Sequence, residues 1–286
     1  MEAMKKKHIP KPDWLKIRLG DTDIYGKTSA LIEKFGLNTI CVSGKCPNQG
    51  ECWSRGTATF MIAGAICTRS CKFCNTLTGK PLPLDPQEPE HLASVIASMK
   101  LKHAVITSVD RDDLPDMGAA HWVRTIREIK KQNPDTTIEV LIPDFQGRLD
   151  LVDLVIEADP DIISHNIETV ERLTPSVRSA AKYDVSLNVL NRIASKGMVA
   201  KSGLMLGLGE TTEEVRRTIQ DLLDNGCSVL TLGQYLQPTK RHLPVERYVH
   251  PDEFDLLKED ALRFGFKKVE SGALVRSSYH AEKHVL

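Results

Sequence analysis

The sequence predicts an α/β protein, a partial (β/α)6 barrel of the TIM type with an extension at each end. Short apolar runs rich in Val, Ile and Leu alternate with amphipathic segments from about residue 60 to residue 233, which is typical of parallel β/α units. This alternation also suits an open doubly wound sheet. The repeating part covers only about 175 of the 286 residues, whereas a closed eightfold barrel takes about 250. A partial barrel of six units therefore fits best.

The repeating part is expected to hold six strands separated by helices. The strands are predicted at Phe60–Ile66, His103–Val109, Thr137–Ile142, Asp161–His165, Lys201–Leu206 and Ser228–Gly233, each short and rich in Val, Ile or Leu. The helices are predicted over residues 89–100, 118–132, 149–158, 168–196 with a break near Pro175, and 212–225. Thr211 and Glu214 have the spacing of a capping box for the last helix, and Asn225-Gly226 is a suitable stop.

The two ends of the chain differ from this repeating part. Residues 1–58 are polar and scattered with Gly, Pro and Asn, so they predict an N-terminal extension with one short helix near Ser29–Phe35. Residues 59–236 form the barrel. Residues 237–286 are expected to form a C-terminal extension that closes the barrel, with a helix at Pro251–Phe264 after a proline-rich stretch.

Charge and composition narrow the class of protein. The 38 basic residues balance 38 acidic ones, so neither nucleic acid nor a membrane surface is expected as a partner. No apolar run approaches the roughly 20 residues that span a bilayer, and the start of the chain lacks the apolar core of a secretory signal. The cytoplasm is the expected compartment. Disulfides are rare there, so seven cysteines with six in two tight groups favour metal binding.

The second of these groups, called here the second trio, is Cys67, Cys71 and Cys74. It follows the first predicted strand, at the end where β/α folds place their chemistry. A zinc site would need a fourth ligand nearby, and the next downstream histidine is His91. A [4Fe–4S] cluster with three irons held by protein and one left open explains the pattern better.

The stretch CTRSCKFC, with Phe73 as its aromatic residue, resembles the C-x3-C-x2-C signature of the radical S-adenosylmethionine (SAM) superfamily. The resemblance implies that the open iron binds the amino and carboxylate groups of SAM. Reductive cleavage of SAM would then give a 5′-deoxyadenosyl radical that abstracts hydrogen.

The resemblance also implies SAM contacts at the ends of later strands. The expected cofactor-binding residues are Asn75, Thr107, Ser108, Asp110, Asn166, Glu168, Arg178, Gly203, Met205, Gly207 and Glu210. The stretch around Asp110 also suits an ordinary strand-end turn, and Arg178 also suits a surface position. The segment GLGETT lacks the G-x-G-x-x-G spacing, so a Rossmann site is excluded.

The first trio is Cys41, Cys46 and Cys52, in the N-terminal extension. A structural zinc or a second cluster would each need a fourth ligand. The remaining cysteine, Cys227, lies in an apolar strand, where a lone thiol usually serves as a small buried hydrophobe.

The spacing of both trios together with RSSY at 276–279 resembles the lipoyl synthase family over almost the whole chain. CPNQGECW and SVDRDDLPDMGA are typical of that family too. The resemblance implies that a serine of RSSY completes an auxiliary [4Fe–4S] cluster on the first trio, with Ser278 expected and Ser277 as the alternative. A serine oxygen is a harder ligand than a thiolate, so it suits a cluster that is dismantled for its sulfur.

The resemblance implies insertion of two sulfur atoms into an octanoyl chain on a carrier-protein lysine, with two SAM consumed. The expected partners are octanoylated lipoyl carrier domains of 2-oxoacid dehydrogenase E2 or glycine cleavage H protein, and a low-potential donor such as ferredoxin or flavodoxin. No catalytic residue is expected beyond the ligands of the clusters and SAM. Two rivals remain: another radical SAM enzyme with an auxiliary cluster, and a two-cluster electron carrier, although such carriers complete their clusters with cysteine.

Overall fold

The computed structural model describes residues 9–17 and 21–284. Its centre is an eight-stranded sheet in which the strands follow the order β1-β2-β5-β6-β7-β8-β9-β10. The strands are β1 (Asn38–Thr39), β2 (Thr59–Ile62), β5 (His103–Ser108), β6 (Thr137–Leu141), β7 (Ile162–Ser164), β8 (Val199–Leu206), β9 (Val229–Gln234) and β10 (Lys268–Gly272). Only β1 is antiparallel to its neighbour. The sheet curves without pairing its two ends within the described part of the chain, which confirms an α/β fold of partial-barrel type.

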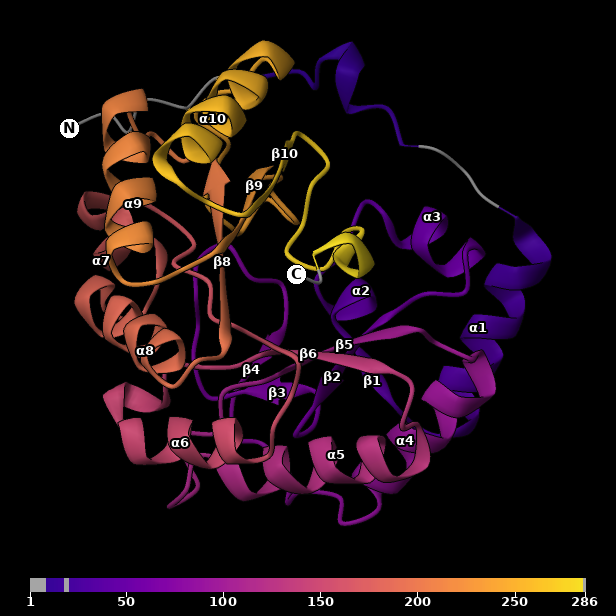
Figure 1. Ribbon diagram of the computed structural model, residues 1–286. Coiled ribbons are helices and arrows are strands. Elements are labelled where there is room, and N and C mark those ends of the chain that lie inside the picture. The colour runs from indigo at the N-terminus through magenta and orange to yellow at the C-terminus, as the bar shows by residue number, and fades with distance from the viewer. Residues whose placement is uncertain (1–8, 18–20, 285–286) are drawn as a thin grey trace.

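Helices cover the outer face of the curved sheet (Figure 1). They are α4 (Glu88–Met99), α5 (Ala119–Gln132), α6 (Leu149–Glu157), α8 (Tyr183–Ser195), α9 (Thr212–Asp224) and α10 (Pro251–Phe264). Each turns an apolar face inward; in α9, for example, Val215, Ile219 and Leu222 are buried. The predicted capping box of α9 is present, with Thr211 Oγ1 accepting from the Glu214 N–H.

The remaining elements are short, apart from α1, and most lie in the N-terminal part. They are η1 (Asp13–Leu15), α1 (Thr22–Lys34), α2 (Ile40–Ser43), α3 (Gln49–Ser54), β3 (Ile66–Cys67), β4 (Leu77–Thr78), η2 (Phe145–Gly147), η3 (Glu171–Leu173), α7 (Thr174–Val177) and η4 (Ala281–Lys283). Helix α1 begins earlier than the predicted Ser29 because the Asp21 carboxylate accepts from the N–H groups of Asp23 and Ile24, which is a regular N-cap.

Two further predicted elements differ from the structure. The first strand ends at Ile62 rather than Ile66, because Ala63 and Gly64 take positive φ values of 68° and 100°. The segment 168–196 is α-helical only from 174 to 177 and from 183 to 195, with the short 3-10 helix η3 at 171–173 before them. Pro175 lies in the first turn of α7, where its missing N–H is harmless, and the break follows at residues 178–182.

Strand β10 was not expected from the sequence. It extends the parallel sheet by pairing Lys268 with Val229 and Gly272 with Gly233 of β9. The segment KVESG contains a single apolar β-branched residue, too weak a pattern for prediction, and tertiary pairing with β9 supplies what the pattern lacks.

After β10 the chain returns toward the opposite edge of the sheet. The Asn48 side-chain N–H donates to the Leu274 carbonyl at 2.7 Å, and Thr59 Oγ1 donates to Ser278 Oγ at 2.7 Å. Figure 1 shows this C-terminal segment in yellow, between β10 and the side that carries α2 and β2. The segment that contains Leu274 and Ser278 is thereby held against the N-terminal extension and β2.

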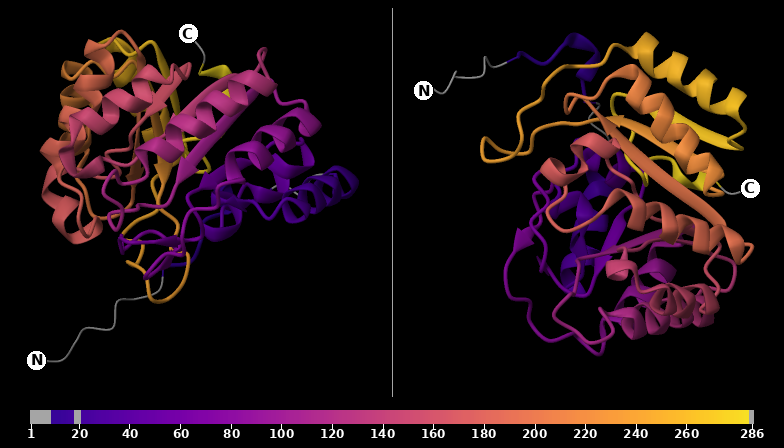
Figure 2. Two further views of the ribbon diagram at one scale, coloured as in Figure 1. Left: turned by 90° about the horizontal axis from the view of Figure 1, so that it is seen from below. Right: turned by 90° about the vertical axis from the view of Figure 1, so that its left-hand side faces the viewer.

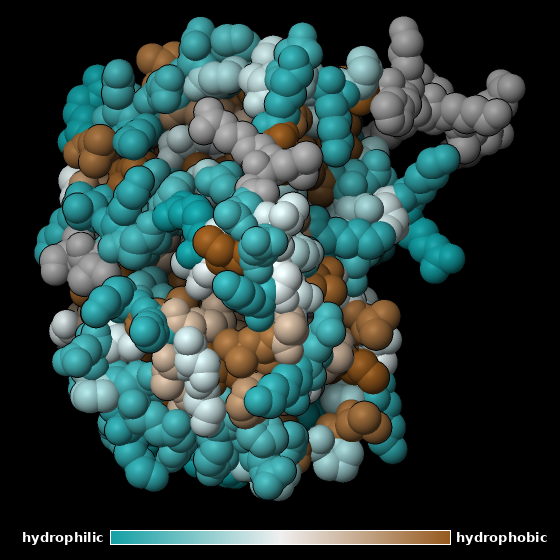
Figure 3. All heavy atoms as spheres, turned by 90° about the vertical axis from the view of Figure 1, so that its right-hand side faces the viewer, coloured by the Kyte–Doolittle hydropathy of each residue, from teal (hydrophilic) through white to brown (hydrophobic). Residues whose placement is uncertain are grey.

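The face of the molecule shown in Figure 3 is mainly polar. Hydrophilic residues cover most of the face shown in Figure 3, and apolar side chains occur there in small separate groups. Among the helices of the described ranges, none combines the length and hydropathy that crossing a bilayer requires.

Candidate active site

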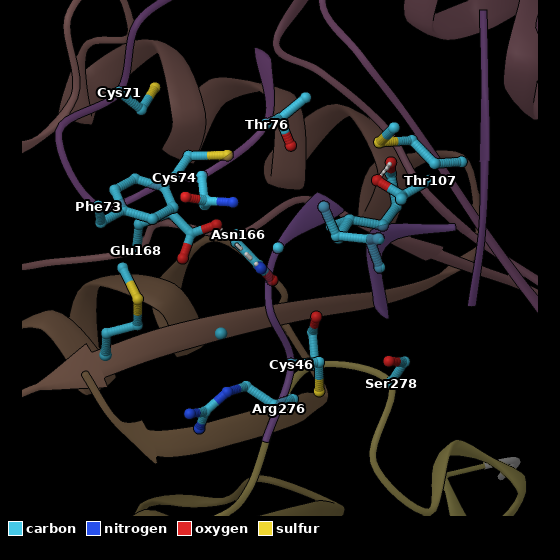
Figure 4. A pocket seen from close by; sticks show the side chains of 18 of the residues that line it. Cys46, Cys71, Phe73, Cys74, Thr76, Thr107, Asn166, Glu168, Arg276 and Ser278 are labelled. Atoms are coloured by element: carbon cyan, nitrogen blue, oxygen red, sulfur yellow. Dashed lines mark hydrogen bonds between the residues drawn. The ribbon is translucent and has the colours of Figure 1, made fainter. Parts of the chain in front are cut away.

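One cavity of about 360 Å³ lies at the carboxyl ends of the parallel strands. Five of the six clustered cysteines line it: Cys41, Cys46, Cys67, Cys71 and Cys74. Cys52 is half-buried, and burial, together with the charges of the nearby Cys46 and Cys41, raises the pKa of its thiol. All seven cysteines are free thiols. Figure 4 shows Cys71 and Cys74 at one end of the cavity and Cys46 with Ser278 at the other.

The second trio lies on one loop that starts at β3. The Cys74 N–H donates to the Cys71 carbonyl, and the Gly79 N–H donates to the Cys67 carbonyl. A second loop, residues 237–247, packs against the loop of the second trio. His242 Nε2 lies 2.9 Å from the Cys74 carbonyl, and the Leu243 N–H donates to the Lys72 carbonyl. Figure 2 shows both loops at the same end of the molecule. The trio is therefore presented by a short, doubly fastened loop.

Arg69, inside the second trio, fixes the loop to the barrel. Its buried guanidinium forms a two-bond pair with Asp112 at 2.7 and 2.8 Å and lies 2.8 Å from Asp144 and 3.3 Å from Asp110. Burial opposes ionisation of Asp144, but the hydrogen bond and charge of Arg69 outweigh it and lower the pKa. Burial and the charge of Asp110 raise the pKa of the Cys67 thiol to about 12. A positive metal centre is needed to draw that proton away.

Most of the residues expected to contact SAM lie on the cavity wall. These are Asn75, Thr107, Ser108, Asp110, Asn166, Glu168, Arg178, Gly203 and Met205. The ends of β5 and β8 and the segment after β7 supply most of them. Asn75 also links the two trios, because its side-chain N–H donates to the Ser43 carbonyl of α2 at 2.8 Å.

Asn166 and Glu168 face the middle of the cavity. Asn166 donates to the Glu168 carboxylate at 3.1 Å, and burial raises the pKa of Glu168. The side-chain oxygen of Asn166 is buried and accepts no hydrogen bond from any residue that the structure describes. A Cβ on Gly203 would lie 2.9 Å from that oxygen, so glycine keeps the space open. An unpartnered acceptor beside an open space fits a ligand that carries hydroxyl or amino groups.

Gly207 and Glu210 shape a loop outside the cavity wall. The N–H groups of Gly207 and Leu208 donate to the Glu210 carboxylate at 2.6 and 2.9 Å. Gly207 has a φ of 98°, and a Cβ there would lie 2.5 Å from the Arg247 carbonyl. Arg178 is likewise engaged, donating to Ser186 Oγ at 2.8 Å and to the Ile167 carbonyl.

The first trio is held by α2 and α3. Cys41 lies in α2, which Thr39 caps, and Cys52 lies in α3. Burial raises the pKa of Cys41, while hydrogen bonds from Thr59 and Trp53 oppose that rise. Among the described residues, no oxygen, nitrogen or sulfur atom accepts a hydrogen bond of good geometry from the buried indole N–H of Trp53. Its neighbour is the Cys41 sulfur, where a donor stabilises the thiolate form.

The RSSY segment lies directly beside the first trio. Thr59, which contacts Cys41, also donates to Ser278 Oγ at 2.7 Å. Arg276 lies next to Cys46 (Figure 4), and its charge partly offsets the burial that raises the pKa of that thiol. A Cβ on Gly233 would lie 2.2 Å from the Val275 carbonyl, so glycine in β9 allows the segment to pass this close. Ser278 and the first trio, far apart in sequence, are neighbours in the fold.

The donor sets suit clusters in chemistry and number. Among the described residues, no three Cys, His, Asp or Glu side chains converge on a position for one metal ion. Each protein ligand of a cubane binds a different iron, so convergence on one point is not required. Three thiols with a hydroxyl, and three thiols without one, therefore fit two clusters of four irons.

Sequence reasoning missed several residues that shape this site. Arg69, Trp53, Thr59 and Lys201 are all buried beside the cysteines or the RSSY segment. Arg69 has a local signal, since it stands inside the second trio. The other three sit in apolar or mixed runs, and only their contacts in the fold distinguish them.

Comparison with known proteins agrees with these observations. The Radical SAM superfamily model matches residues 61–222. "Lipoyl synthase" of Parabacteroides distasonis is 68% identical over 97% of this chain and 99% of its own length. The proteins of the same name from Porphyromonas gingivalis and Treponema denticola are 62% and 59% identical, covering 97% and 96% of this chain and 99% and 95% of their own.

The chain belongs to the lipoyl synthase family of the radical SAM superfamily. Lipoyl synthases are radical SAM sulfurtransferases that use SAM and [4Fe–4S] clusters, so the family, class of enzyme and cofactors expected from the motifs are confirmed.

Solved structures outside the lipoyl synthase family share the fold. Methylornithine synthase has a TM-score of 0.56 at 13% identity, covering 92% of this chain and 82% of its own. Streptococcus suis SuiB bound to its precursor peptide has a TM-score of 0.59 at 10% identity, covering 86% of this chain and 52% of its own.

Proposed function

We propose that this chain inserts two sulfur atoms at the sixth and eighth carbons of an octanoyl group carried on a lysine of another protein. The second trio would hold the SAM-binding cluster, and the first trio with Ser278 would hold the cluster that is the sulfur donor. The observation that carries this proposal is the single cavity into which cysteines of both trios open.

The chemistry requires such an arrangement. The two C–H bonds are unactivated, so no side-chain base can remove a proton from them. When bound, SAM on its cluster supplies a one-electron route to hydrogen abstraction. The chain itself would hold the octanoyl group between the sulfur-donor cluster and the SAM-binding cluster. It would also keep other groups that could give up a hydrogen atom away from the substrate radical. Met61, Val109, Leu141 and Leu204 are apolar residues of the cavity wall that suit an alkyl chain.

Individual residues would have distinct tasks. Asn166 and Glu168 would accept hydrogen bonds from SAM, since one carries a buried unpartnered oxygen and the other a carboxylate facing the cavity. Asp110, Thr107 and Ser108 would contact the amino group from the end of β5. Gly207 and Glu210 would act indirectly, by setting the loop after β8.

Ser278 would be the most easily released protein ligand of the sulfur-donor cluster. It must lose its hydroxyl proton to bind iron, and the adjacent Thr59 hydroxyl at 2.7 Å offers a hydrogen-bond partner throughout. Ser277, whose backbone carbonyl accepts a hydrogen bond from Lys201, is the alternative ligand. A harder oxygen ligand is more easily released than a thiolate, which suits a cluster that gives up its sulfur.

We further propose three working parts: residues 1–58, which carry the first trio, a radical SAM part at 59–236, and a closing part at 237–286. Octanoylated domains of 2-oxoacid dehydrogenase E2 or glycine cleavage H protein would be the substrates. Ferredoxin or flavodoxin would supply electrons. Six clustered free thiols suit a reducing compartment such as the cytoplasm.

The test is anaerobic reconstitution to about eight irons per chain, followed by reaction with an octanoyl-lysyl peptide, SAM and a reductant. The expected result is a peptide that gains two sulfur atoms while two deoxyadenosines form. Deoxyadenosine without sulfur in the peptide would favour a different radical SAM reaction. Neither product would favour an electron carrier.

A further inference from the structure

Lys201 is a fully buried lysine near the start of β8. Its ammonium group makes three hydrogen bonds, to Glu139 Oε1 at 2.7 Å, to His284 Nδ1 at 2.8 Å and to the Ser277 carbonyl at 2.7 Å. Glu139 is on β6 and belongs to the sheet, whereas Ser277 and His284 belong to the C-terminal segment. The lysine therefore joins the interior of the barrel to the segment that carries RSSY.

A polar cluster surrounds this lysine on the inner face of four adjacent strands. Ser164 of β7 donates to Glu139 Oε1 at 2.9 Å, and His103 Nε2 of β5 lies 3.5 Å from Glu139 Oε2. These strands are neighbours in the sheet. An ion pair buried this deeply seldom adds net stability compared with apolar packing. Apolar residues would fill the space, but they could not bind a backbone carbonyl of the last segment.

The charges in the cluster support the observed bonding. Burial opposes ionisation of Glu139, but the adjacent Lys201 lowers its pKa to about 2. Burial, with the charge of Lys201, lowers the pKa of His284 to about 4. His284 is therefore neutral near pH 7, and its Nδ1 can accept a hydrogen bond from the ammonium group.

The anchored carbonyl precedes Ser278 directly in the chain. Ser278 Oγ also accepts from Thr59, and Leu274 is bound by Asn48, which stands between Cys46 and Cys52. The segment is thus tied from the barrel side by Lys201 and from the side of the first trio by Thr59 and Asn48. The bond from Lys201 joins the segment to β8 and, through Glu139, to β6, whereas the bond from Thr59 joins it to β2 at the other side of the sheet.

We propose that Lys201 is a positioning residue for sulfur insertion: it binds the Ser277 carbonyl and so presents Ser278 to the first trio. The inference rests on the proposed role of Ser278 as a ligand. Lys201 does not contact the reacting atoms. Loss of Lys201 is expected to make the segment 275–280 more flexible. It is also expected to weaken the retention of the iron that Ser278 would bind in the donor cluster.

The test compares four full-length variants. Lys201→Met combined with Glu139→Gln removes the anchor without leaving a buried unpaired carboxylate. Ser278→Ala removes the ligand itself. Ser164→Ala is the matched control, because Ser164 touches the same carboxylate and has no bond to the segment. His284→Leu weakens the anchor from outside the sheet, so it remains informative if the double variant does not fold.

Two measurements do not depend on activity. Hydrogen exchange at 275–280 is measured on the cluster-free chain. Iron loss from the donor cluster is followed by the EPR signal of the three-iron form after mild oxidation. This is done in a background with Cys67, Cys71 and Cys74 changed to Ala, so that the second trio contributes no signal. Circular dichroism and thermal unfolding check the fold of every variant.

The double variant is expected to lose iron roughly 10- to 100-fold faster than the parent, as Ser278→Ala does, which is the usual scale for groups that support a metal ligand. Exchange at 275–280 should accelerate as well, His284→Leu should shift both readouts less, and Ser164→Ala should match the parent. Parent-like exchange and iron retention in a folded double variant would overturn the proposal.

The two proposals fail in different ways. If Ser278→Ala retains iron as firmly as the parent, Ser278 is not a ligand, and the anchor loses its function even where exchange responds to Lys201. If Ser278→Ala loses iron but the double variant does not, the ligand stands and Lys201 serves the fold alone.

Discussion

The two cysteine trios differ in how the fold completes them. The second trio spans eight residues on one loop, so its geometry is settled locally once that loop is fastened. The first trio depends on a segment more than 200 residues away, as the hydrogen bond between Asn48 and Leu274, 226 positions apart, shows. A cluster site with three protein ligands can be formed by one loop. A site whose fourth ligand is a distant serine requires the tertiary fold to bring that serine to the cysteines.

The surroundings of the trios differ as well. An arginine and three aspartates surround the second trio. At the first trio, the hydroxyl of Thr59 and the indole of Trp53 lie near Cys41, Arg276 lies near Cys46, and Glu51 and Arg55 lie near Cys52. A hydrogen-bonded network of charges holds a loop rigidly in place, whereas the neutral donors Thr59 and Trp53 lower the pKa of the Cys41 thiol without adding a charge.

Removal of a ligand from the second trio should have the largest effect. Cys71→Ala is expected to lose about four of about eight irons and to abolish deoxyadenosine formation, while the cluster on the first trio remains. Iron analysis and product chromatography check this. Cys227→Ala is the control, since that thiol is buried in the strand region and lines no part of the cavity. A full complement of iron in Cys71→Ala would refute the assignment.

Replacing Ser278 by cysteine should slow sulfur insertion more than it impairs assembly of the donor cluster. Ser278→Cys is expected to bind its full iron yet to insert sulfur about tenfold more slowly or worse, equivalent to about 1.4 kcal/mol of barrier, because a thiolate releases iron less readily. Single-turnover assays that count sulfur per peptide measure this. Sulfur transfer at the parent rate would show that easy release of the serine ligand does not matter for sulfur insertion.

Acid should loosen both regions. Burial, aided by the charge of Arg178, lowers the pKa of His165 to about 4, and burial lowers that of His284 to about 4. Between that value and the unfolded value near 6.5, the unfolded chain binds more protons, so stability falls as pH falls through this window. The loss should be about 2 kcal/mol for each histidine by pH 5. Urea unfolding of the cluster-free chain at pH 7 and 5 measures it.

The two histidines can be separated by mutation. His165→Gln should remove part of this pH dependence near the SAM-side strands, and His284→Leu should remove the part that belongs to the C-terminal segment. Unchanged pH dependence in both variants would contradict the assignment to buried neutral imidazoles.

The smallest effect is expected at the neutral donors of the first trio. Trp53→Phe removes one N–H that faces the Cys41 sulfur and preserves most of the packing. Hydrogen bonds to cluster sulfur raise the reduction potential, so the potential of the donor cluster should become more negative. An EPR-monitored redox titration checks the direction. No change, or a positive shift, would mean that the indole serves packing only.

The sequence by itself determined the class of fold, the family and the two sets of thiols. Alternating apolar runs specify parallel strands and covering helices, and cysteine spacing within a loop survives any detail of packing. Two predictions were wrong for local reasons. The positive φ values of Ala63 and Gly64 end the first strand earlier than predicted, and the sequence pattern of β10 is too weak to predict a strand.

Only the tertiary structure decided which distant groups meet. RSSY is an ordinary polar tail until the chain returns across the sheet and Thr59 reaches Ser278. Lys201 looks misplaced in an apolar strand until Glu139, His284 and the Ser277 carbonyl surround it. The physical reason is that a buried charge and a distant ligand are stabilised by partners, and partners are a property of the fold rather than of any stretch of sequence.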